Sequence, residues 1–569
     1  MKSPFGEVPA LCKLKRPSYF FTVLCLGLIS LLSLAHPQIA TPVRQAGAAC
    51  AKCHQQIFRN YLKKPMANAS GMATERLVPG EFLHSPSEVN YQILVEDRAA
   101  WLVYRRQNNR VLQGRERLEY FLGFGHLGLT YLYSKNNYLL ESPIAYYPDL
   151  KTYDMKPGLE KIDHLPGALT INATCLRCHM SAVQQPESGT ENRYEGLPFL
   201  HLGITCESCH GDTREHIATN GIAGVVNPLK LTPEKRESVC IVCHLEGATN
   251  VERSGRSVLV FQPGQEITDY ISYFAYTSEN TIRRGVSEIE QFMSSKCKRT
   301  TGAGMSCMNC HDPHYSPSSE ARAVFYRQKC LVCHSQSKYT AAHYPGNPDC
   351  TGCHMPKTGA KNIPHVAWTD HRIRQHPDED DSVDEGGGGE NQLKPSLSAS
   401  VDPRDLALAH YNLAVNGHTQ EKARATEMLN SVVKSSPDDP SVLRALAVLS
   451  EWNGDRYRAA ELYREVLARD PDSLTSMVNL GTLLAKSGNY RSAESLWKKA
   501  FDRNEDVLGL AQNLATLECM LSDKNAALDV LQRALIYSPD IPELRDKFEL
   551  IRDGPDSCKT SVTVSREGP

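Results

Sequence analysis

The sequence has no marked excess of charge of either sign. It contains 63 lysines and arginines against 65 aspartates and glutamates, which gives a formal net charge of −2 at pH 7. A chain that binds nucleic acid or an anionic membrane surface through its overall charge would be clearly basic. We therefore expect no nucleic-acid partner.

Cysteine is scarce outside one recurring motif. Fourteen of the 19 cysteines lie in seven copies of that motif, and the five others are Cys12, Cys25, Cys297, Cys519 and Cys558. Small secreted domains that depend on disulfides use most of their cysteines in pairs that join loops. The cysteine content of this chain therefore does not indicate a disulfide framework.

Long apolar runs are also lacking, apart from one near the N-terminus. A basic segment at residues 13–16 precedes an apolar run from Tyr19 to Leu34, slightly short for a membrane-spanning helix of about 20 residues. This pattern is typical of a secretory signal or of an uncleaved N-terminal membrane anchor. Small side chains at Ser33 and Ala35 fit cleavage after Ala35, and no small residue precedes Cys25, which argues against a lipoprotein. We predict that residues 1–35 direct export.

The recurring motif is Cys-x-x-Cys-His, the attachment signature of a c-type haem. Two thiols form thioethers to the porphyrin, and the adjacent histidine is placed to bind iron from one face. A random chain of this composition would contain about 0.02 such motifs. The seven copies are Cys50/Cys53/His54, Cys175/Cys178/His179, Cys206/Cys209/His210, Cys240/Cys243/His244, Cys307/Cys310/His311, Cys330/Cys333/His334 and Cys350/Cys353/His354.

Zinc-binding turns are the alternative interpretation of these cysteine pairs. Zinc sites take such pairs two at a time, and nothing about zinc requires a histidine after every pair. Here the number of pairs is odd and a histidine follows each one. Haem is attached to cytochromes c outside the cytoplasm, which agrees with the export segment. The motifs therefore predict seven covalently bound haems c.

The motifs mark out a haem-binding domain that we place at residues 45–376. From Cys175 onward a motif follows every 20 to 70 residues, which leaves too little polypeptide for independent apolar cores. The macrocycles would then supply much of the buried material, with short helices and loops packed around them. In the long segment between Cys50 and Cys175, two β-rich stretches, 89–95 and 99–105, flank a polar break and predict a small β-hairpin. The fold class we predict is mainly α.

The C-terminal part of the chain has a repeating helical pattern. Residues 377–401 are acidic and rich in glycine and serine, and predict a flexible linker. Beyond them a period of 34 residues recurs in Ala425, Ala459, Ala493 and Ala527, and in Pro437, Pro471 and Pro539 with Glu505 in the remaining slot. Helix pairs with this period are the signature of tetratricopeptide repeats, which stack into an α-solenoid.

We place about four repeats at residues 402–553. Ser441–Trp452 and Tyr457–Arg469 form one expected helix pair, joined near Asn453-Gly454. Ile541–Arg552 is the expected capping helix, which covers the last apolar face of the stack. We predict that the tail, residues 554–569, is disordered.

The second axial position of each iron decides what the haems can do. A second histidine or a methionine gives an electron carrier, whereas an open position lets the iron bind a substrate. The candidate partners ahead of the linker are His84, His126, His164, His201, His216, His314, His343, His365, His371, His376 and the thioether of Met66.

Spacing restricts the choice for His314, which follows His311 by three residues. Axial ligands must approach the iron from opposite faces of the ring, and three residues span at most about 10 Å. That length is poorly suited to carry the chain around the edge of the macrocycle. We therefore expect His314 to bind a neighbouring haem. The same argument applies less strongly to His216, six residues after His210.

Three stretches resemble multihaem cytochromes of the cytochrome c-552/c-554 type. They are Cys206–Gly211 with His216, Cys307–His314, and the run from His365 to Ile373 that contains His371. That superfamily includes hydroxylamine oxidoreductase and the pentahaem and octahaem nitrite reductases, and the resemblance covers roughly residues 45–376. It implies stacked bis-histidine haems, with His216, His314, His365 and His371 at positions that resemble distal ligands.

The first motif and the motif endings depart from that resemblance. Family members often have a histidine shortly after the first motif, where this chain has Met66, so Met66 is a candidate ligand. The related nitrite reductases carry a lysine in place of the motif histidine at the active haem, whereas all seven motifs here end in histidine. This difference lowers the expectation of catalysis, and we assign no catalytic residue.

The sequence thus predicts an exported seven-haem electron carrier of a bacterial envelope. It would reside in the periplasm or on the outer face of the envelope, with possible anchoring by its N-terminus. We expect the repeats to dock a redox partner protein. The alternative is a multihaem oxidoreductase that reduces or oxidises a small nitrogen or sulfur compound at one open haem. A third view makes the repeats a scaffold and the haems mainly structural.

Overall fold

The computed structural model describes residues 47–107, 111–123, 128–276, 286–334, 349–359, 367–374, 392–398 and 400–554. All seven motifs lie within these ranges. The export segment, the predicted tail beyond Gly554 and most of the predicted linker lie outside them. So do four candidate ligands, His126, His343, His365 and His376.

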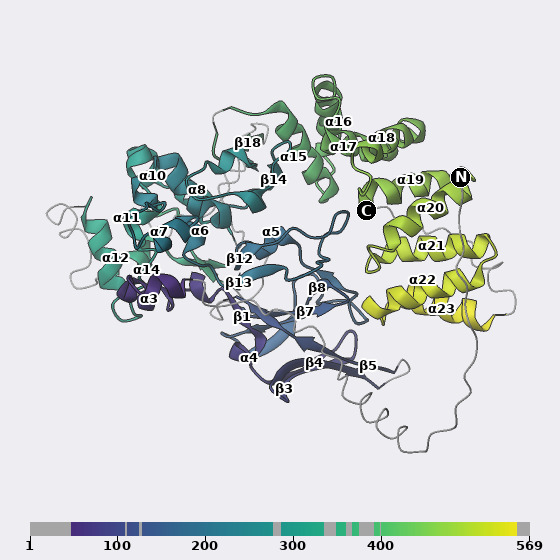
Figure 1. Ribbon diagram of the computed structural model, residues 1–569, viewed down its shortest axis with the longest axis horizontal. Helices are drawn as coiled ribbons and strands as arrows, with labels where there is room; N and C mark the ends of the chain where they lie inside the picture. Colours follow the sequence, from purple (N-terminus) through teal and green to yellow (C-terminus); the bar gives the residue numbers. More distant parts are fainter. Residues whose placement is uncertain are drawn as a thin grey trace, which may run out of the picture. The chain divides into compact units, whose positions relative to one another are not determined.

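The segment between the first two motifs is a β-structure much larger than the expected hairpin. Five antiparallel strands lie in the order β1-β6-β7-β8-β11, and four more in the order β2-β3-β4-β5. The first sheet consists of β1 (Ser70–Met72), β6 (Tyr120–Leu122), β7 (Thr130–Lys135), β8 (Tyr138–Glu141) and β11 (Leu169–Thr170). The second consists of β2 (Gly80–His84), β3 (Val89–Glu96), β4 (Ala99–Arg106) and β5 (Leu112–Leu118), side by side in Figure 1.

The predicted hairpin is confirmed as β3 and β4. Glu96 pairs with Ala99, and the two turn residues between them, Asp97 and Arg98, have φ angles of 49° and 62°. Positive φ at both central residues is the type I′ geometry, whose twist matches that of the strands. Alternate residues of β3, such as Tyr91 and Ile93, are buried, as expected for a strand with one covered face.

The two sheets share one apolar core. Tyr91, Leu102, Phe121 and Tyr131 belong to a single cluster of buried residues. The prediction of a mainly α fold is therefore wrong for this region and holds only for the rest of the chain. Smaller sheets pair β9 (Ile144–Tyr147) with β10 (Thr152–Met155), β12 (Met180–Val183) with β13 (Phe199–Leu202), and β16 (Lys357–Gly359) with β17 (Ala367–Thr369).

The helices of the haem region are short, as predicted. They are α2 (Ala48–Ala51), α3 (Gln55–Tyr61), α4 (Ala73–Arg76), α5 (Ala173–Leu176), α6 (Glu207–His210), α7 (Arg214–Ala218), α8 (Pro233–His244), α9 (Glu288–Ser294), α10 (Lys296–Thr301), α11 (Cys307–Cys310), α12 (Arg322–Leu331) and α14 (Cys350–His354). Single 3₁₀ turns are η1 (Met66–Asn68), η2 (Pro228–Lys230), η3 (Val258–Val260), η4 (Ile267–Asp269) and η5 (Gly302–Gly304). Among the described residues, α11, α12 and α14 bury none of their own.

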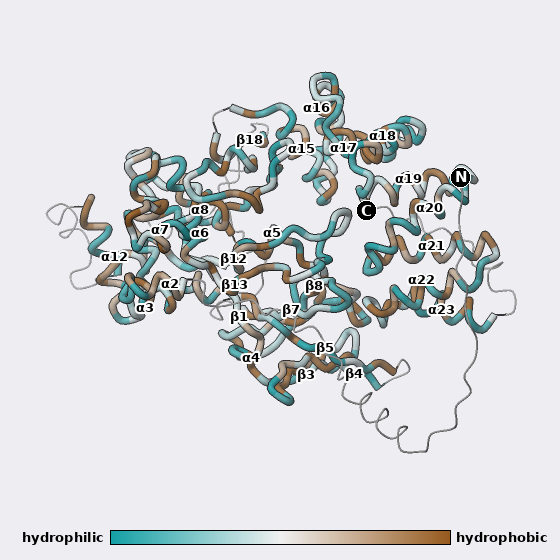
Figure 2. The backbone as a smooth tube through the Cα atoms, in the orientation of Figure 1, coloured by the Kyte–Doolittle hydropathy of each residue, from teal (hydrophilic) through white to brown (hydrophobic). Residues whose placement is uncertain are grey.

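The repeats form four stacked helix pairs and a final single helix (Figure 1). The pairs are α15 (Pro403–Val415) with α16 (Glu421–Val432), α17 (Pro440–Trp452) with α18 (Arg456–Arg469), α19 (Leu474–Lys486) with α20 (Tyr490–Phe501), and α21 (Leu508–Met520) with α22 (Lys524–Tyr537). The last helix is α23 (Pro542–Asp553). All four periodic alanines are completely buried, because only a small side chain lets neighbouring helices approach closely at these positions. Figure 2 shows that α17 is largely apolar.

Part of the predicted linker is ordered. Leu393–Pro395 forms β18, which pairs with β15 (Ile271–Tyr276), and β15 also pairs with β14 (Thr249–Glu252). Leu393 is buried in the same apolar cluster as Phe274 of β15 and Leu408 of α15. The prediction of a flexible linker therefore fails for these residues, since their backbone and side chains are engaged.

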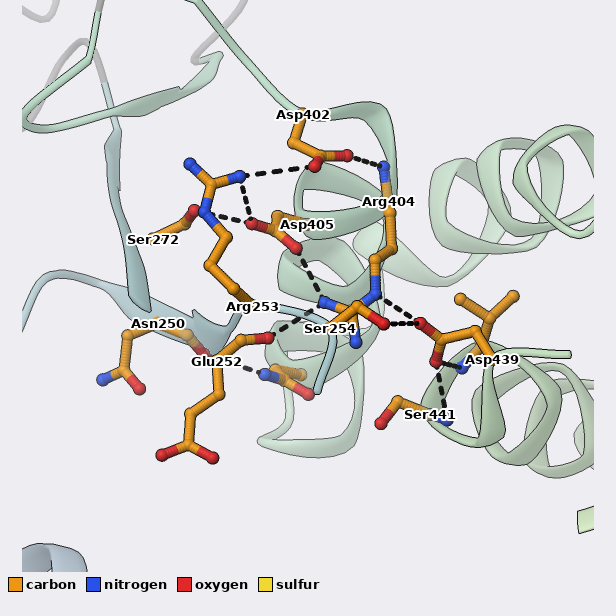
Figure 3. A network of polar contacts seen from close by, with 12 residues as sticks. Asn250, Glu252, Arg253, Ser254, Ser272, Asp402, Arg404, Asp405, Asp439 and Ser441 are labelled. Carbon is orange, nitrogen blue, oxygen red and sulfur yellow. Dashed lines mark hydrogen bonds and ion pairs between the residues drawn. The ribbon is translucent and has the colours of Figure 1, made fainter. Parts of the chain in front are cut away.

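A polar network also joins the first repeat to the β14–β15 sheet (Figure 3). Arg253 contacts Asp405 at 2.8 Å, and the hydroxyl of Ser272 donates to Asp405 at 2.7 Å. Arg404 donates to the backbone carbonyl of Glu252 at 2.9 Å and pairs with Asp439 at 2.7 Å. Asp405 is almost fully buried, so its carboxylate depends on these donors in place of water.

Candidate haem-binding site

The motif residues are arranged by single helical turns. In four motifs the backbone N–H of the histidine donates to the carbonyl of the first cysteine, at 2.8 Å for His54 and 2.9 Å for His210, His311 and His334. Residues three and four apart in a helix lie on one face, so this turn brings both sulfurs and the imidazole to the same side. All fourteen motif cysteines are free thiols.

Side-chain caps start several of these turns. The side chain of Asn172 accepts a hydrogen bond from the backbone of Cys175 at 3.0 Å, and Asp349 does the same for Gly352 at 2.9 Å. Ser306 and Asn309 form a capping box around Cys307. Such caps satisfy donors that the first turn of a helix leaves open, so the short motif helices are fixed by local sequence.

Three motif histidines each face a second histidine from elsewhere in the chain. The ring centres are 6.4 Å apart for His54 and His216, 5.9 Å for His210 and His314, and 6.2 Å for His311 and His371. A metal–imidazole bond is about 2.0–2.1 Å long and the nitrogen lies about 1.1 Å from its ring centre, so two axial imidazoles have centres about 6 Å apart. The spacing of all three couples leaves room for one iron between the rings.

Hydrogen bonds to backbone carbonyls orient several of these imidazoles. Nδ1 lies 2.8 Å from the Val226 carbonyl in His210, 2.8 Å from the Ala223 carbonyl in His216 and 2.9 Å from the Thr369 carbonyl in His371. His354 makes the same contact with the Arg374 carbonyl at 2.7 Å. A carbonyl only accepts, so Nδ1 carries the proton and Nε2 keeps its lone pair for a metal.

Burial also keeps two of the paired imidazoles neutral, which is the form that binds metal. Burial, with His371 and Lys64 nearby, lowers the pKa of His311 to about 4. Burial, with the neighbouring His210, lowers the pKa of His314. His244 has a different neighbour: its Nδ1 lies 3.8 Å from a carboxylate oxygen of Glu288.

Cysteines of different motifs lie against each other. Side-chain hydrogen bonds join Cys50 to Cys206, Cys178 to Cys243, Cys240 to Cys307, and Cys330 to Cys350. Electrostatic contacts link Cys209 to Cys240 and Cys310 to Cys330. The seven motifs therefore form one continuous cluster in which each has a close neighbour.

Exposure distinguishes some motif cysteines from the others, although the sequence treats all fourteen alike. Cys53, Cys333 and Cys353, the second cysteines of the first, sixth and seventh motifs, are exposed, as is Cys175 of the second motif. Cys53 and Cys333 follow the ends of α2 and α12, and Cys353 lies within α14, three short helices that bury none of their own residues.

The expectation that every motif is enclosed with its haem is therefore corrected at Cys53, Cys333 and Cys353. The physical reason is that so short a helix covers one face only, so a thiol on its other side meets solvent. Attachment of haem to these three cysteines stays a prediction. It would place one edge of the first, sixth and seventh haems at the surface of the protein.

The residues present fit a covalently attached haem. Arg177, inside the second motif, is largely buried and donates to the Val242 carbonyl, but its Nε has no hydrogen-bond partner among the described residues. A haem carries carboxylate side chains, and a guanidinium group is the donor that pairs best with them. Within the described ranges, no group of three or more histidine, cysteine, aspartate or glutamate side chains converges as a site for a bare metal ion.

Not every candidate ligand lies beside a motif. His84 is buried, with Nε2 3.0 Å from the Glu160 carbonyl and Nδ1 2.7 Å from the Ser87 hydroxyl. Nε2 must then donate and Nδ1 accept, so no lone pair is left for iron. His164 directs Nδ1 to the carbonyl of Leu165 at 3.0 Å, and His201 lies in β13. Met66 lies in η1, and the ring that faces His54 belongs to His216.

The comparisons agree with a haem c-binding region joined to helical repeats. Residues 149–211 match the family model described as cytochrome c554 and c-prime, and residues 473–512 match a tetratricopeptide repeat model. The first match includes the second and third motifs. The chain thus combines a cytochrome c554-type segment with tetratricopeptide repeats. No curated protein sequence matches it.

Solved structures that resemble the chain include three repeat proteins. A crystal structure of MamA is 15% identical, covers 25% of this chain and 85% of its own, and has a TM-score of 0.23. YrrB, a TPR protein with an unusual peptide-binding site, gives 23%, 22%, 66% and 0.20 for the same quantities. PilF of Pseudomonas aeruginosa gives 18%, 27%, 72% and 0.23. TM-scores this low support no functional argument.

In the part of the chain that the structure describes, no helix combines the length and the apolar character needed to cross a membrane.

Proposed function

We propose that the protein is an exported cytochrome that holds seven haems c and relays electrons between them. The observation that carries this proposal is the set of three imidazole couples, each of which joins a motif histidine to a histidine of another segment at about the spacing of two axial ligands. Two strong axial ligands on one iron favour electron transfer over substrate binding.

The assigned pairs are His54 with His216, His210 with His314, and His311 with His371. In this assignment His216 takes the sixth position at the first haem, in place of Met66. His216 and His314 each serve a haem other than that of the motif they follow, in line with the spacing argument. His365, which the family resemblance implies as a further distal ligand, lies outside the described residues.

The contacts between motif sulfurs support a relay. Each sulfur would be bonded to the edge of its own porphyrin, so touching sulfurs mean neighbouring haem edges. The contacts connect the first motif to the third, the third to the fourth, the second to the fourth, the fourth to the fifth, and the fifth to the seventh through the sixth. Electrons could therefore pass through all seven haems.

The exposed motif cysteines support entry and exit of electrons at the ends of this relay. Cys53 belongs to the first motif, and Cys333 and Cys353 belong to the last two. A thioether that faces solvent leaves the attached edge of its porphyrin close to the surface, where a partner protein can approach it. The first haem and the sixth and seventh haems would then be the points of exchange with a donor and an acceptor.

The repeats are proposed to bind a protein partner through the edge that the rest of the chain leaves open. The turns between successive repeats contact the haem region, as at Asp472 with Ser188 and Asp439 with Ser254. The turns inside the repeats, around Asn453-Gly454 and Gly488-Asn489, are exposed. A redox partner would reach these turns, and the protein would act in the periplasm or at the outer face of the envelope.

Spectroscopy of the purified full-length holoprotein tests the proposal. We expect seven haems per chain by pyridine haemochrome assay, and optical and EPR spectra dominated by low-spin ferric haem. A substantial high-spin ferric signal in the wild type would contradict an all-carrier protein and would favour the oxidoreductase alternative. Mass spectrometry of the mature N-terminus in the envelope fraction tests export and cleavage after Ala35.

A further inference from the structure

The side chain of Lys64 reaches from the segment after the first motif to the turn that carries His314. Its Nζ donates to the backbone carbonyl of Asp312 at 2.9 Å and to that of Tyr315 at 3.0 Å. These two carbonyls belong to the first and last residues of one four-residue turn, whose Tyr315 N–H bonds back to Asp312. A single ammonium group therefore ties both ends of the turn around His314.

Lys64 is itself held in place. Its backbone N–H donates to the Tyr61 carbonyl at 2.8 Å, and its own carbonyl accepts from the Asn68 side chain at 2.9 Å. Only 9% of the residue is exposed. Burying a lysine is costly unless the ammonium group is hydrogen-bonded, so this geometry is retained only because the two carbonyls receive its protons. The adjacent Lys63, by contrast, is exposed.

The turn would otherwise depend on few contacts of its own. The backbone N–H of His314 donates to the carboxylate of Asp312 at 2.8 Å, which is a local Asx turn. Nothing in that local bond directs the His314 ring toward His210, on a different helix. The two bonds from Lys64 connect the turn to the segment that follows α3, and so fix where the ring lies.

We infer that Lys64 is a positioning residue for the distal ligand His314 and places a fixed positive charge between two neighbouring haems. The inference rests on the proposed ligation of the third haem by His210 and His314. The ammonium group also acts on His311 of the fifth motif, so its charge lies near the iron sites of both the third and fifth motifs. A nearby cation disfavours the ferric state, which carries more positive charge, and makes reduction easier.

Three full-length holoprotein variants test the inference. Lys64→Met keeps the length of the side chain without donors or charge, Lys64→Gln keeps an amide donor without charge, and Lys63→Met is the matched control. For Lys64→Met we expect a full haem count, a new high-spin ferric EPR signal from up to one haem in seven, and harder reduction. The equilibrium constant for reduction of the affected haems should fall about tenfold, or about 59 mV for a one-electron couple.

Lys64→Gln separates the two roles and guards against misfolding of the methionine variant. We expect it to remain low-spin while showing the same fall in reduction potential. Lys63→Met should match the wild type in both measurements. If both Lys64 variants match Lys63→Met in EPR spectrum and potentials, the inference is wrong.

His314→Ala distinguishes this failure from failure of the ligation itself. If that variant gains a high-spin signal while the Lys64 variants are unchanged, His314 is a ligand that needs no support from Lys64. If His314→Ala leaves the spectrum unchanged, the proposed pair of His210 and His314 is wrong, whatever the Lys64 variants do.

Discussion

His210 and His314 face each other with their ring centres 5.9 Å apart and their planes inclined by only 10°. One follows the third pair of cysteines and the other lies beyond the fifth pair. If one iron lies between them, the turn after the fifth motif closes the site of the third haem. The fold of the fifth motif and the electronic state of the third haem are then coupled.

Replacing His314 should therefore affect a haem that its own motif does not hold. In His314→Ala we expect all seven haems to remain attached, because the thioether bonds are untouched, while one haem becomes high-spin. EPR and optical spectra of the ferric protein measure this change. His84→Gln is the control, since both nitrogens of His84 already bond protein atoms. Loss of the fifth haem in His314→Ala, with no high-spin signal, would contradict the assignment.

The first haem offers a comparison between two possible ligands. His216 faces His54 with ring centres 6.4 Å apart, whereas Met66 lies in η1. We expect His216→Ala to produce a high-spin signal from one haem, and Met66→Leu, which keeps the volume of the side chain, to leave the spectrum unchanged. The reverse result would restore the thioether as the sixth ligand.

The haem motifs could be predicted from sequence because their chemistry is local. Cysteine spacing defines one helical turn, and three residues are too few to carry His314 to the far face of its own haem. That argument indicated a neighbouring haem for His314. It could not say which one, because the approach of α6 to the turn after α11 depends on contacts between distant segments, including those of Lys64. Nor could spacing show that Cys53, Cys333 and Cys353 are exposed, since the motif is identical where the sulfur is covered.

The β-structure was largely missed for a different reason. β3 alternates buried and partly or fully exposed residues, and β4 largely does, which is the pattern that reveals a strand. In β6 all three residues are buried, and in β8 three of four are buried. Such short strands lack alternation, so their pairing is decided by tertiary packing. Their aromatic content was assigned to packing around haem, and much of it instead fills the core between the two sheets.

The repeats were predicted best, because each helix pair contacts mainly its neighbours in sequence. The helix expected at Ser441–Trp452 is α17, Pro440–Trp452, and that expected at Tyr457–Arg469 is α18, Arg456–Arg469. The same period held a second signal. Aspartates recur every 34 residues at Asp438, Asp472, Asp506 and Asp540, and the last three interact with residues of the haem region.

The last of these aspartates forms a buried ion pair with β4. Asp540 accepts from Arg106 at 2.8 Å and from the backbone N–H of Leu165 at 2.7 Å, and the two side chains are 0% and 6% exposed. Removing one partner of a buried pair leaves the other charge uncompensated and costs about 3–5 kcal/mol. We expect Asp540→Ala to lower the free energy of unfolding by about that amount, measured by urea denaturation followed by circular dichroism.

The exposed pair of Arg115 and Glu96, on the outer strands of the same sheet, supplies the control. Its side chains are 47% and 55% exposed, and such surface pairs contribute about 0–1 kcal/mol. Glu96→Ala should therefore change the free energy of unfolding much less than Asp540→Ala. Equal effects of the two substitutions would show that the contact between repeat and sheet is not a stabilising one.

Asp506 makes the repeat contact sensitive to pH. Burial, with the negative charges of Glu191 and Glu505 nearby, raises the pKa of Asp506 to about 6 from its usual 3.8. A carboxyl whose pKa is raised in the folded state stabilises the fold when protonated, at a pH below its unfolded pKa. That contribution is lost as the pH rises through about 6. At pH 7.5 the buried charge should cost about 1–3 kcal/mol.

Asp506→Asn should remove this dependence. We expect the asparagine variant and the wild type to have similar free energies of unfolding near pH 4, and the variant to be the more stable at pH 7.5. Comparing the difference between the two proteins at each pH cancels the titration of other groups. Asp529→Asn, at an exposed aspartate of α22, should shift the free energy of unfolding by no more than about 0.5 kcal/mol at either pH. If the wild type were instead the more stable at pH 7.5, the Asp506 carboxylate would be a favourable partner of the haem region.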